Sequence, residues 1–119
     1  MNEKNLSPPV IYLENSDFKA DGTLKTPPNV PCVIMIQSNS CGYCTIAKPD
    51  FQNFAEKYNK KVKCLSIEAD SNPKGWHSLL PKIKPGFRGF PDYLLVGENK
   101  KQIGNNRSFQ DLVEFANLK

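Results

Sequence analysis

Long apolar runs are missing from this chain of 119 residues. No stretch approaches the roughly 20 consecutive apolar residues that a transmembrane helix requires. The first nine residues, MNEKNLSPP, are polar and lack the apolar core of a signal peptide. We therefore predict no membrane association and a cytoplasmic location, where cysteines point to metal or redox chemistry rather than to a disulfide framework.

The excess of charge is also small. Sixteen basic and 12 acidic residues give a net charge of +4. The densest basic runs, at 60–63 and 82–84, are not interleaved with aromatic residues, whereas a nucleic-acid groove combines a dense basic stripe with rings that stack on bases. We therefore predict no nucleic-acid partner and interpret these runs as solvated faces.

Length and composition fit one small globular domain. A hydrophobic content of 39% and a charged content of 24% argue against a disordered chain. A chain of 119 residues is long enough for one core but not for two. We predict a flexible N-terminus at residues 1–9 and a single domain at residues 10–119.

Apolar runs and periodicity predict that strands and helices alternate along the chain. Strands are expected at 10–13, 31–36, 62–67, 93–96 and 101–103, helices from Cys44 to Tyr58 and from Ser108 onward, and one or two helical turns between Asn72 and Ile83. The run at 31–36 is apolar throughout, as in a strand buried on both faces, whereas apolar and polar residues alternate at 62–67. This order predicts an α/β fold with a mixed central sheet flanked by helices.

The segment between the first two strands has a different composition. It carries one glycine and three prolines, which are Gly22, Pro27, Pro28 and Pro31. These residues disfavour a regular helix, so a proline-rich loop is expected in place of a first helix.

Cys41 and Cys44 stand three residues apart where a predicted strand ends and a helix begins. At a helix N-terminus the two thiols can close a disulfide within the first turn, and unpaired backbone N–H groups favour the thiolate of the leading cysteine. Cys41 is therefore the predicted nucleophile that attacks a substrate disulfide. Cys44, deeper in the helix, is predicted to release the product by attacking Cys41. Between them, Gly42 permits a tight turn and Tyr43 offers a partly exposed ring.

A zinc site is the main alternative for this pair. Structural zinc takes four ligands, often from two such pairs, and this chain has one pair. His77 with Cys32 or Cys64 could complete a set, but both cysteines lie inside predicted strands. We therefore predict no metal and no other cofactor. Cys32 and Cys64 are interpreted as buried inert thiols, with a second disulfide or a regulatory thiol as the alternative.

Two segments together resemble the thioredoxin family. They are CGYCTIAKP at residues 41–49 and FRGFPDYLL at residues 87–95. The resemblance implies a thioredoxin fold over most of the chain, a proline inside the active-site helix at Pro49, and a cis-proline beside the dithiol at Pro91. It also implies a groove for an extended substrate strand, lined by Gly42, Tyr43, Phe90, Pro91 and Gly104.

The chain departs from the family pattern around the second cysteine. Family members usually have Trp where this chain has Ser40, a buried Asp that relays the proton where it has Met35, and a partnering Lys where it has Ser66. The relay is therefore expected to be absent or to be performed by Glu68, Asp92 or water. Asp92 replaces a usual Thr; it could act as a base if it faces the dithiol, and is otherwise a capped or solvated acid.

The resemblance implies a monomeric thiol–disulfide oxidoreductase that reduces disulfide-containing proteins. Its electrons would come from an upstream thiol reductase or from the glutathione system. A disulfide oxidase or isomerase is the first alternative, because the residues between the two cysteines include no proline, which by analogy makes the pair more oxidising. A binding module without turnover is the second, and it is disfavoured because both cysteines are present.

Overall fold

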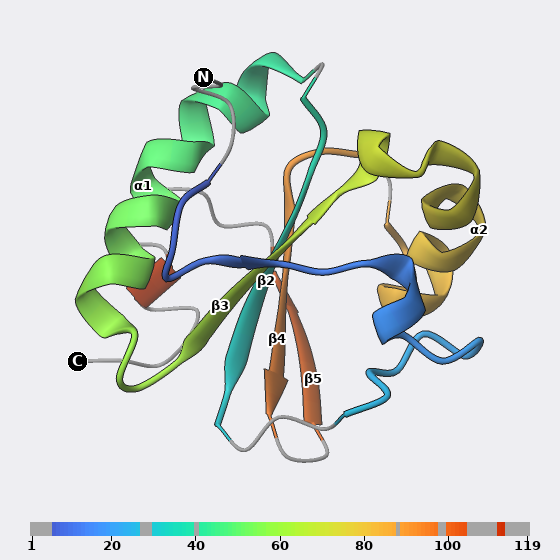
Figure 1. The fold of residues 1–119 in the computed structure, drawn as a ribbon, viewed down its shortest axis with the longest axis horizontal. Coiled ribbons are helices and arrows are strands. Elements are labelled where there is room, and N and C mark those ends of the chain that lie inside the picture. The colour runs from blue at the N-terminus through green and yellow to red at the C-terminus, as the bar shows by residue number, and fades with distance from the viewer. Residues whose placement is uncertain are drawn as a thin grey trace.

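A five-stranded sheet forms the centre of the protein. The computed structural model describes residues 6–26, 30–39, 41–87, 89–97, 100–104 and 112–113. Its elements are β1 (Ile11–Tyr12), β2 (Cys32–Gln37), α1 (Gly42–Tyr58), β3 (Lys63–Glu68), α2 (Pro73–Ile83), β4 (Asp92–Gly97) and β5 (Lys100–Gly104), with short 3-10 turns η1 (Asn15–Asp17) and η2 (Ala69–Ser71). Helix α1 covers one face of the sheet and α2 the other (Figure 1).

The sheet is mixed, as predicted. Its order is β1–β3–β2–β4–β5. Strands β1, β3 and β2 are parallel, whereas β4 pairs antiparallel with β2 and with β5. Because parallel strands end at the same edge of a sheet, the residues that follow β1, β2 and β3 gather at one end of the molecule. That end is where β2 leads into α1.

Both central strands are buried. Every residue of β2 is buried, as its apolar sequence predicted, and all of β3 except Lys63 is buried as well. The alternation of polar and apolar residues in β3 therefore does not mark a solvated face. The reason is its position between β1 and β2, where helices cover both faces and Ser66 donates a hydrogen bond to the Met35 carbonyl at 3.0 Å.

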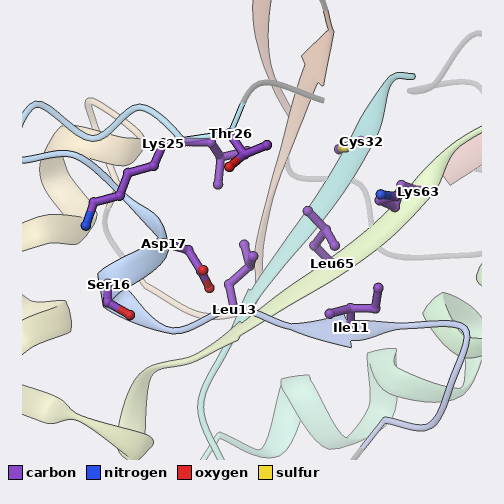
Figure 2. A pocket seen from close by; sticks show the side chains of 10 residues that line it. Ile11, Leu13, Ser16, Asp17, Lys25, Thr26, Cys32, Lys63 and Leu65 are labelled. Atoms are coloured by element: carbon purple, nitrogen blue, oxygen red, sulfur yellow. The ribbon is translucent and has the colours of Figure 1, made fainter. Parts of the chain in front are cut away.

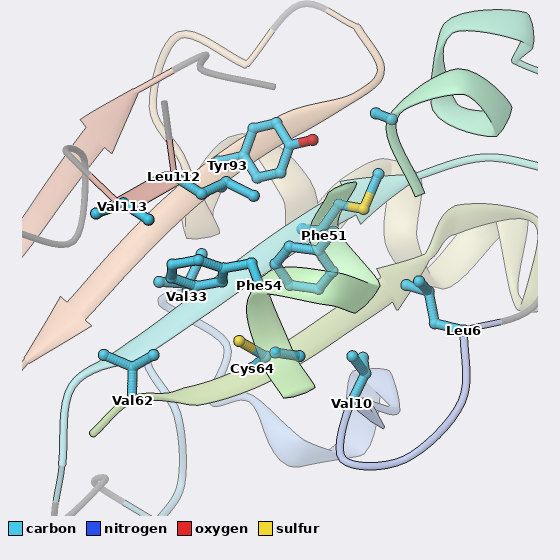
Figure 3. Close-up of a cluster of buried hydrophobic side chains, with 13 residues drawn as sticks. Leu6, Val10, Val33, Phe51, Phe54, Val62, Cys64, Tyr93, Leu112 and Val113 are labelled. Atoms are coloured by element: carbon cyan, nitrogen blue, oxygen red, sulfur yellow. The ribbon is translucent and has the colours of Figure 1, made fainter. Parts of the chain in front are cut away.

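The sheet divides the core in two. The cluster on the α1 face, drawn in Figure 3, consists of Leu6, Val10, Val33, Met35, Ala47, Phe51, Phe54, Ala55, Val62, Cys64, Tyr93, Leu112 and Val113. The cluster on the α2 face consists of Phe18, Cys32, Ile34, Ile36, Leu65, Ile67, Ala69, Trp76, Leu80, Ile83 and Leu94. Successive side chains of a strand point to opposite faces, so Met35 lies under α1 and Ile36 under α2.

Helix α1 follows the predicted pattern. Ala47, Phe51, Phe54 and Ala55 recur at three- and four-residue spacing and are buried against the sheet. Pro49 lies inside the helix, as the resemblance implied.

Helix α2 is more regular than predicted. It runs for 11 residues from Pro73 to Ile83, whereas one or two turns were expected. Pro73 occupies the first turn, where its missing N–H costs nothing, and the Asn72 side chain accepts a hydrogen bond from Gly75 N at 3.3 Å. Burial of Trp76 and Leu80 on the sheet compensates for the low helix propensity of this segment.

The connection from β1 to β2 contains no α-helix within its described part, residues 13–26 and 30–31. The expected loop in place of a first helix is confirmed there. Gly22 has a φ of +91°, and a Cβ at this position would lie 2.4 Å from the carbonyl carbon of Lys82. Glycine is therefore required where this loop meets the last turn of α2.

The packed domain begins before residue 10, so the predicted boundary is too late. Leu6 is buried in the α1-face cluster, and its N–H donates to the Tyr12 hydroxyl at 2.8 Å. Ser7 N donates to the Gln52 side chain of α1 at 2.8 Å.

Residues 1–5 lie outside the described residues, as does most of the helix predicted from Ser108; residues 112–113 are helical and buried. None of the helices in the described ranges is long and apolar enough to span a bilayer.

Candidate active site

The two cysteines of the Cys-x-x-Cys segment differ in exposure. Cys41 is the N-cap of α1 and is partly exposed, whereas Cys44 in the first turn is fully buried. The backbone N–H of Cys44 donates to Cys41 Sγ at 3.2 Å. Both are free thiols. The helix N-terminus thus presents one accessible sulfur with a second one directly behind it.

The segment before β4 lies against the accessible sulfur. Cys41 Sγ donates to the Phe90 carbonyl oxygen at 3.4 Å. The Phe90–Pro91 peptide is cis, and Pro91 is buried. Gly104 lies on β5 and is in register with Tyr93 of β4. Tyr93 follows Pro91 by two residues. The predicted groove residues Phe90 and Pro91 therefore stand beside Cys41, and Gly104 lies on the strand next to them.

Burial makes the second cysteine a weak acid. Burial first, and then the neighbouring Cys41 sulfur, raise the pKa of Cys44 to about 12. Two groups act in the opposite direction: Ser38 N, which donates to Cys44 Sγ at 3.5 Å, and the positive charge of Lys48. Cys44 is therefore a protonated thiol near neutral pH in the reduced protein.

Lys48 is a buried residue of the site that sequence reasoning missed. Its exposed fraction is 5%, and its Nζ donates to the Asn39 side-chain oxygen at 3.2 Å. The spacing held a usable signal, because Lys48 stands four residues after Cys44 and three before Phe51, on the face that α1 buries.

The loop after β2 is held by two carboxylates. Asn39 N donates to Glu68 Oε2 at 3.1 Å and to Asp70 Oδ2 at 3.0 Å, and Ser38 Oγ donates to Asp70 Oδ2 at 2.9 Å. Glu68, one of the predicted modulators, therefore contacts the loop that carries Ser38 and Asn39. The neighbouring Ser38 in turn donates its N–H to Cys44 Sγ, so this loop connects Glu68 to the second cysteine.

Asp92 points away from the dithiol, toward the α2 face of the sheet. Its carboxylate forms a buried ion pair with Lys84, which follows α2, and accepts the Tyr93 N–H at 3.0 Å. Asp92 pairs in register with Ile36, whose side chain lies on the α2 face. The prediction of a base facing the dithiol is therefore wrong. Of the alternative, a capped or solvated acid that points the other way, the solvated form is wrong, because the carboxylate is buried and paired with Lys84.

The residues considered for zinc do not come together. Cys32 belongs to the α2-face cluster and Cys64 to the α1-face cluster, while His77 is exposed on α2. Within the part of the chain that the structure describes, no group of three or more His, Cys, Asp or Glu side chains could hold a metal ion.

Apolar side chains are exposed beside the dithiol. Tyr43 is 65% exposed and Ile46 is 74% exposed, and they lie three residues apart on α1. Phe87 and Phe90 stack edge to face with ring centroids 5.3 Å apart. Sequence reasoning found Tyr43 but missed Ile46, whose helical periodicity alone does not separate a surface residue from a core one.

A cavity of about 430 Å³ lies elsewhere, near the start of β2 and β3. Figure 2 shows its lining of Ile11, Leu13, Ser16, Asp17, Lys25, Thr26, Cys32, Lys63 and Leu65, to which Leu24 adds. Cys32 and Lys63 begin parallel strands, and the opposite end of this pair is where β2 leads into α1 and the dithiol. The cavity is therefore at the far end of the sheet from Cys41.

Comparisons with known proteins agree with this architecture. The family model "Thioredoxin" matches residues 9–117. The thioredoxin-like protein 453L of Invertebrate iridescent virus 6 is 37% identical over 134 residues, with 96% of each chain covered. The thioredoxin-like protein slr1139 of Synechocystis is 27% identical over 84 residues, with 71% of this chain and 77% of that protein covered.

A solved structure agrees at the level of the fold. The J-Trx1 fragment of ERdj5 matches 92% of this chain with a TM-score of 0.71 at 21% identity, and this chain spans 49% of that fragment. This structural similarity shows a thioredoxin fold, and the family model together with the viral relative shows the family. The chain belongs to the thioredoxin family, whose general activity is thiol–disulfide exchange.

Proposed function

We propose that this protein reduces disulfide bonds in other proteins through a cycle of Cys41 and Cys44. The observation that carries the proposal is the asymmetry of the two thiols. Cys41 is partly exposed at the start of α1, and the buried Cys44 lies directly behind it, joined by a hydrogen bond of 3.2 Å from its N–H. An accessible nucleophile backed by a second thiol is the arrangement that thiol exchange requires.

The proposed reaction has two steps. The Cys41 thiolate attacks one sulfur of a substrate disulfide; a mixed disulfide forms, and the other substrate sulfur leaves and takes up a proton. Cys44 then loses its proton and attacks Cys41 Sγ, which forms the protein's own disulfide and releases the second substrate sulfur as a thiol. Two electrons pass to the substrate, and an upstream thiol reductase or the glutathione system supplies two further electrons that reduce the Cys41–Cys44 disulfide to the dithiol.

The proposed substrate is an extended segment of a disulfide-containing protein, on which this chain acts as a monomer. Cys41 Sγ lies 3.4 Å from the Phe90 carbonyl oxygen, so a substrate sulfur bonded to Cys41 would lie beside the backbone that leads into Pro91. Backbone groups there can pair with an extended chain. Gly42, Tyr43 and Gly104 complete the proposed groove.

Insulin reduction tests the proposal. We expect catalytic amounts of the protein to accelerate precipitation of insulin B chain by dithiothreitol. Cys41→Ser should abolish the acceleration, because no nucleophile remains. Cys44→Ser should accumulate mixed disulfides, because nothing resolves them. A wild-type protein that folds but gives no acceleration and forms no mixed disulfide would support the binding module instead.

The direction of exchange has its own test. The Gly42–Tyr43 pair lacks proline, and this favours a potential above that of thioredoxin, which is the basis of the second candidate function, disulfide formation or isomerisation. Equilibration with glutathione redox buffers gives the potential directly. A value near −270 mV supports reduction, and a value near −120 mV supports oxidation.

A further inference from the structure

Lys48 is a cation held inside the protein beside the resolving cysteine. It follows Cys44 by one helical turn, so the two side chains share a face of α1. The exposed fraction of Lys48 is 5%, and that of Cys44 is 0%. A lysine is rarely buried to this degree unless its charge has partners.

The loop after β2 fixes the position of this charge. Lys48 Nζ donates to the side-chain oxygen of Asn39 at 3.2 Å. The preceding residue, Ser38, donates its N–H to Cys44 Sγ at 3.5 Å. The ammonium and the thiol are therefore anchored to adjacent residues of one loop.

The other charged groups around this loop are carboxylates. Glu68 and Asp70 accept hydrogen bonds from Asn39 N, and Asp70 also accepts one from Ser38 Oγ. Asp92 on β4 is paired with Lys84 on the α2 side. Lys48 brings a positive charge to the same loop, through its hydrogen bond to Asn39.

The resolving step places a negative charge on the buried sulfur of Cys44, and a nearby positive charge stabilises it. Cys44 must become a thiolate in order to attack the mixed disulfide, and a thiolate in a buried site is unstable without a hydrogen bond or a positive charge. Burial raises the pKa of Cys44, and Lys48 acts against this effect. Met35 lies on the same face of the sheet and contributes no charge.

We propose that the Lys48 ammonium stabilises the thiolate of Cys44 as it forms, and thereby sets the rate of the resolving step. This proposal rests on the proposed function. The Cys44 proton passes to solvent, the new thiolate forms the S–S bond to Cys41, and the departing substrate sulfur takes up a proton. Lys48 remains an ammonium throughout, so it supplies charge and transfers no proton.

Dithiobis(nitrobenzoate), a small aromatic disulfide, separates the two steps. Cys41 attacks the reagent and releases one coloured thiolate, and Cys44 releases the second when it resolves the mixed disulfide. In stopped flow we expect Lys48→Gln to slow the second phase about tenfold near neutral pH and to shift its pH profile upward by about one unit. The first phase should change little, because Cys41 Sγ faces Phe90 O and the helix N-terminus.

Matched variants separate charge from packing. Lys48→Arg keeps the charge and should recover most of the second-phase rate, whereas Lys48→Met should behave as Lys48→Gln does. Lys57→Met removes a lysine from the exposed side of the same helix and should leave both phases unchanged. Circular dichroism of each variant establishes that the fold is retained, and the glutamine and methionine variants give two independent measurements.

The outcomes distinguish this proposal from the proposed function. If Lys48→Gln and Lys48→Met resolve the mixed disulfide at the wild-type rate and with the wild-type pH profile, Lys48 has no such role. If the wild type shows no first phase, the Cys41–Cys44 cycle itself is wrong. The cycle is equally wrong if Cys44→Ser still shows the second phase, because that variant has no thiol at position 44 to resolve the mixed disulfide.

Discussion

Cys32 and Cys64 lie on neighbouring parallel strands, but their side chains enter opposite faces of the sheet. Cys32 is in register with Lys63, and Cys64 is in register with Val33. Cys32 packs in the cluster under α2 and Cys64 in the cluster under α1. The backbone of the sheet therefore separates the two thiols, and they cannot bond without a disruption of β2 or β3.

The first prediction concerns the number of disulfides. We expect the fully oxidised protein to contain one intramolecular disulfide, between Cys41 and Cys44, and to keep Cys32 and Cys64 as thiols. Oxidation of the folded protein, followed by unfolding in guanidinium with an alkylating agent and mass spectrometry of peptides, measures this. If none of the four cysteines were alkylated, Cys32 and Cys64 would also be in a disulfide, and this would contradict their separation by the sheet.

The second prediction concerns stability at alkaline pH. Burial, and secondarily Cys32, raise the pKa of Cys64 from its ordinary 9.0 to about 12. The folded state therefore favours the neutral thiol more than the unfolded chain does. This contribution is fully present below pH 9, and it is lost as pH rises from 9 toward 12.

Urea unfolding at a series of pH values tests this dependence. Between pH 9 and 11 the free energy of unfolding of the wild type should fall more steeply than that of Cys64→Ala, which has no thiol to ionise at this position. The absolute stability of the variant is lower because of the cavity, so the slopes are compared and not the values. Equal slopes would show that Cys64 does not titrate differently on folding.

The third prediction concerns the buried ion pair of Lys84 and Asp92. Its side chains are 6% and 12% exposed, and removal of one partner leaves the other charge buried without compensation. We expect Asp92→Asn to lower the free energy of unfolding by about 3 kcal/mol. The double variant Lys84→Met with Asp92→Leu should lose less than the sum of the two single changes, and additive losses would mean that the pair contributes no coupling.

Features that depend on local sequence were predictable. A buried strand, a Cys-x-x-Cys segment and an amphipathic helix follow one another directly in the chain, so the position of Cys41 at the start of α1 could be read from neighbouring residues. The place of Phe90 and Pro91 beside Cys41 depends on contacts over 49 residues, and only the family resemblance implied it.

Features that depend on distant partners were not predictable. Asp92 alone is compatible with several roles, and its pairing with Lys84 is fixed by the return of the chain from α2 to β4. Lysine is usually a surface residue, so the sequence alone does not indicate that Lys48 is buried. Its burial follows from its contact with the loop after β2. Helix α2 was underestimated because Gly75 and Pro81 lower its intrinsic propensity, which burial on the sheet offsets.

The last prediction concerns the exposed apolar surface beside the dithiol. Ile46 is 74% exposed one turn after Tyr43 on α1. If protein substrates lie across this surface, Ile46→Asp should lower kcat/KM for insulin by about tenfold, or ~1.4 kcal/mol, because an apolar contact is replaced by a charge that must be desolvated. A small disulfide reaches Cys41 without covering Ile46, so the rate of the first phase with dithiobis(nitrobenzoate) should stay within about twofold of wild type.

Ile11→Asp is the matched control for this change. Ile11 is also an exposed isoleucine, at 53%, but it lies on the edge strand β1 and lines the cavity at the far end of the sheet. The same substitution there alters the net charge equally and should leave insulin reduction unchanged. Equal loss of activity in both variants would indicate a general effect of charge on the encounter with insulin, and loss of the small-disulfide reaction in Ile46→Asp would indicate damage to Cys41. Only a loss confined to Ile46→Asp and to the protein substrate identifies this part of α1 as a surface that protein substrates contact.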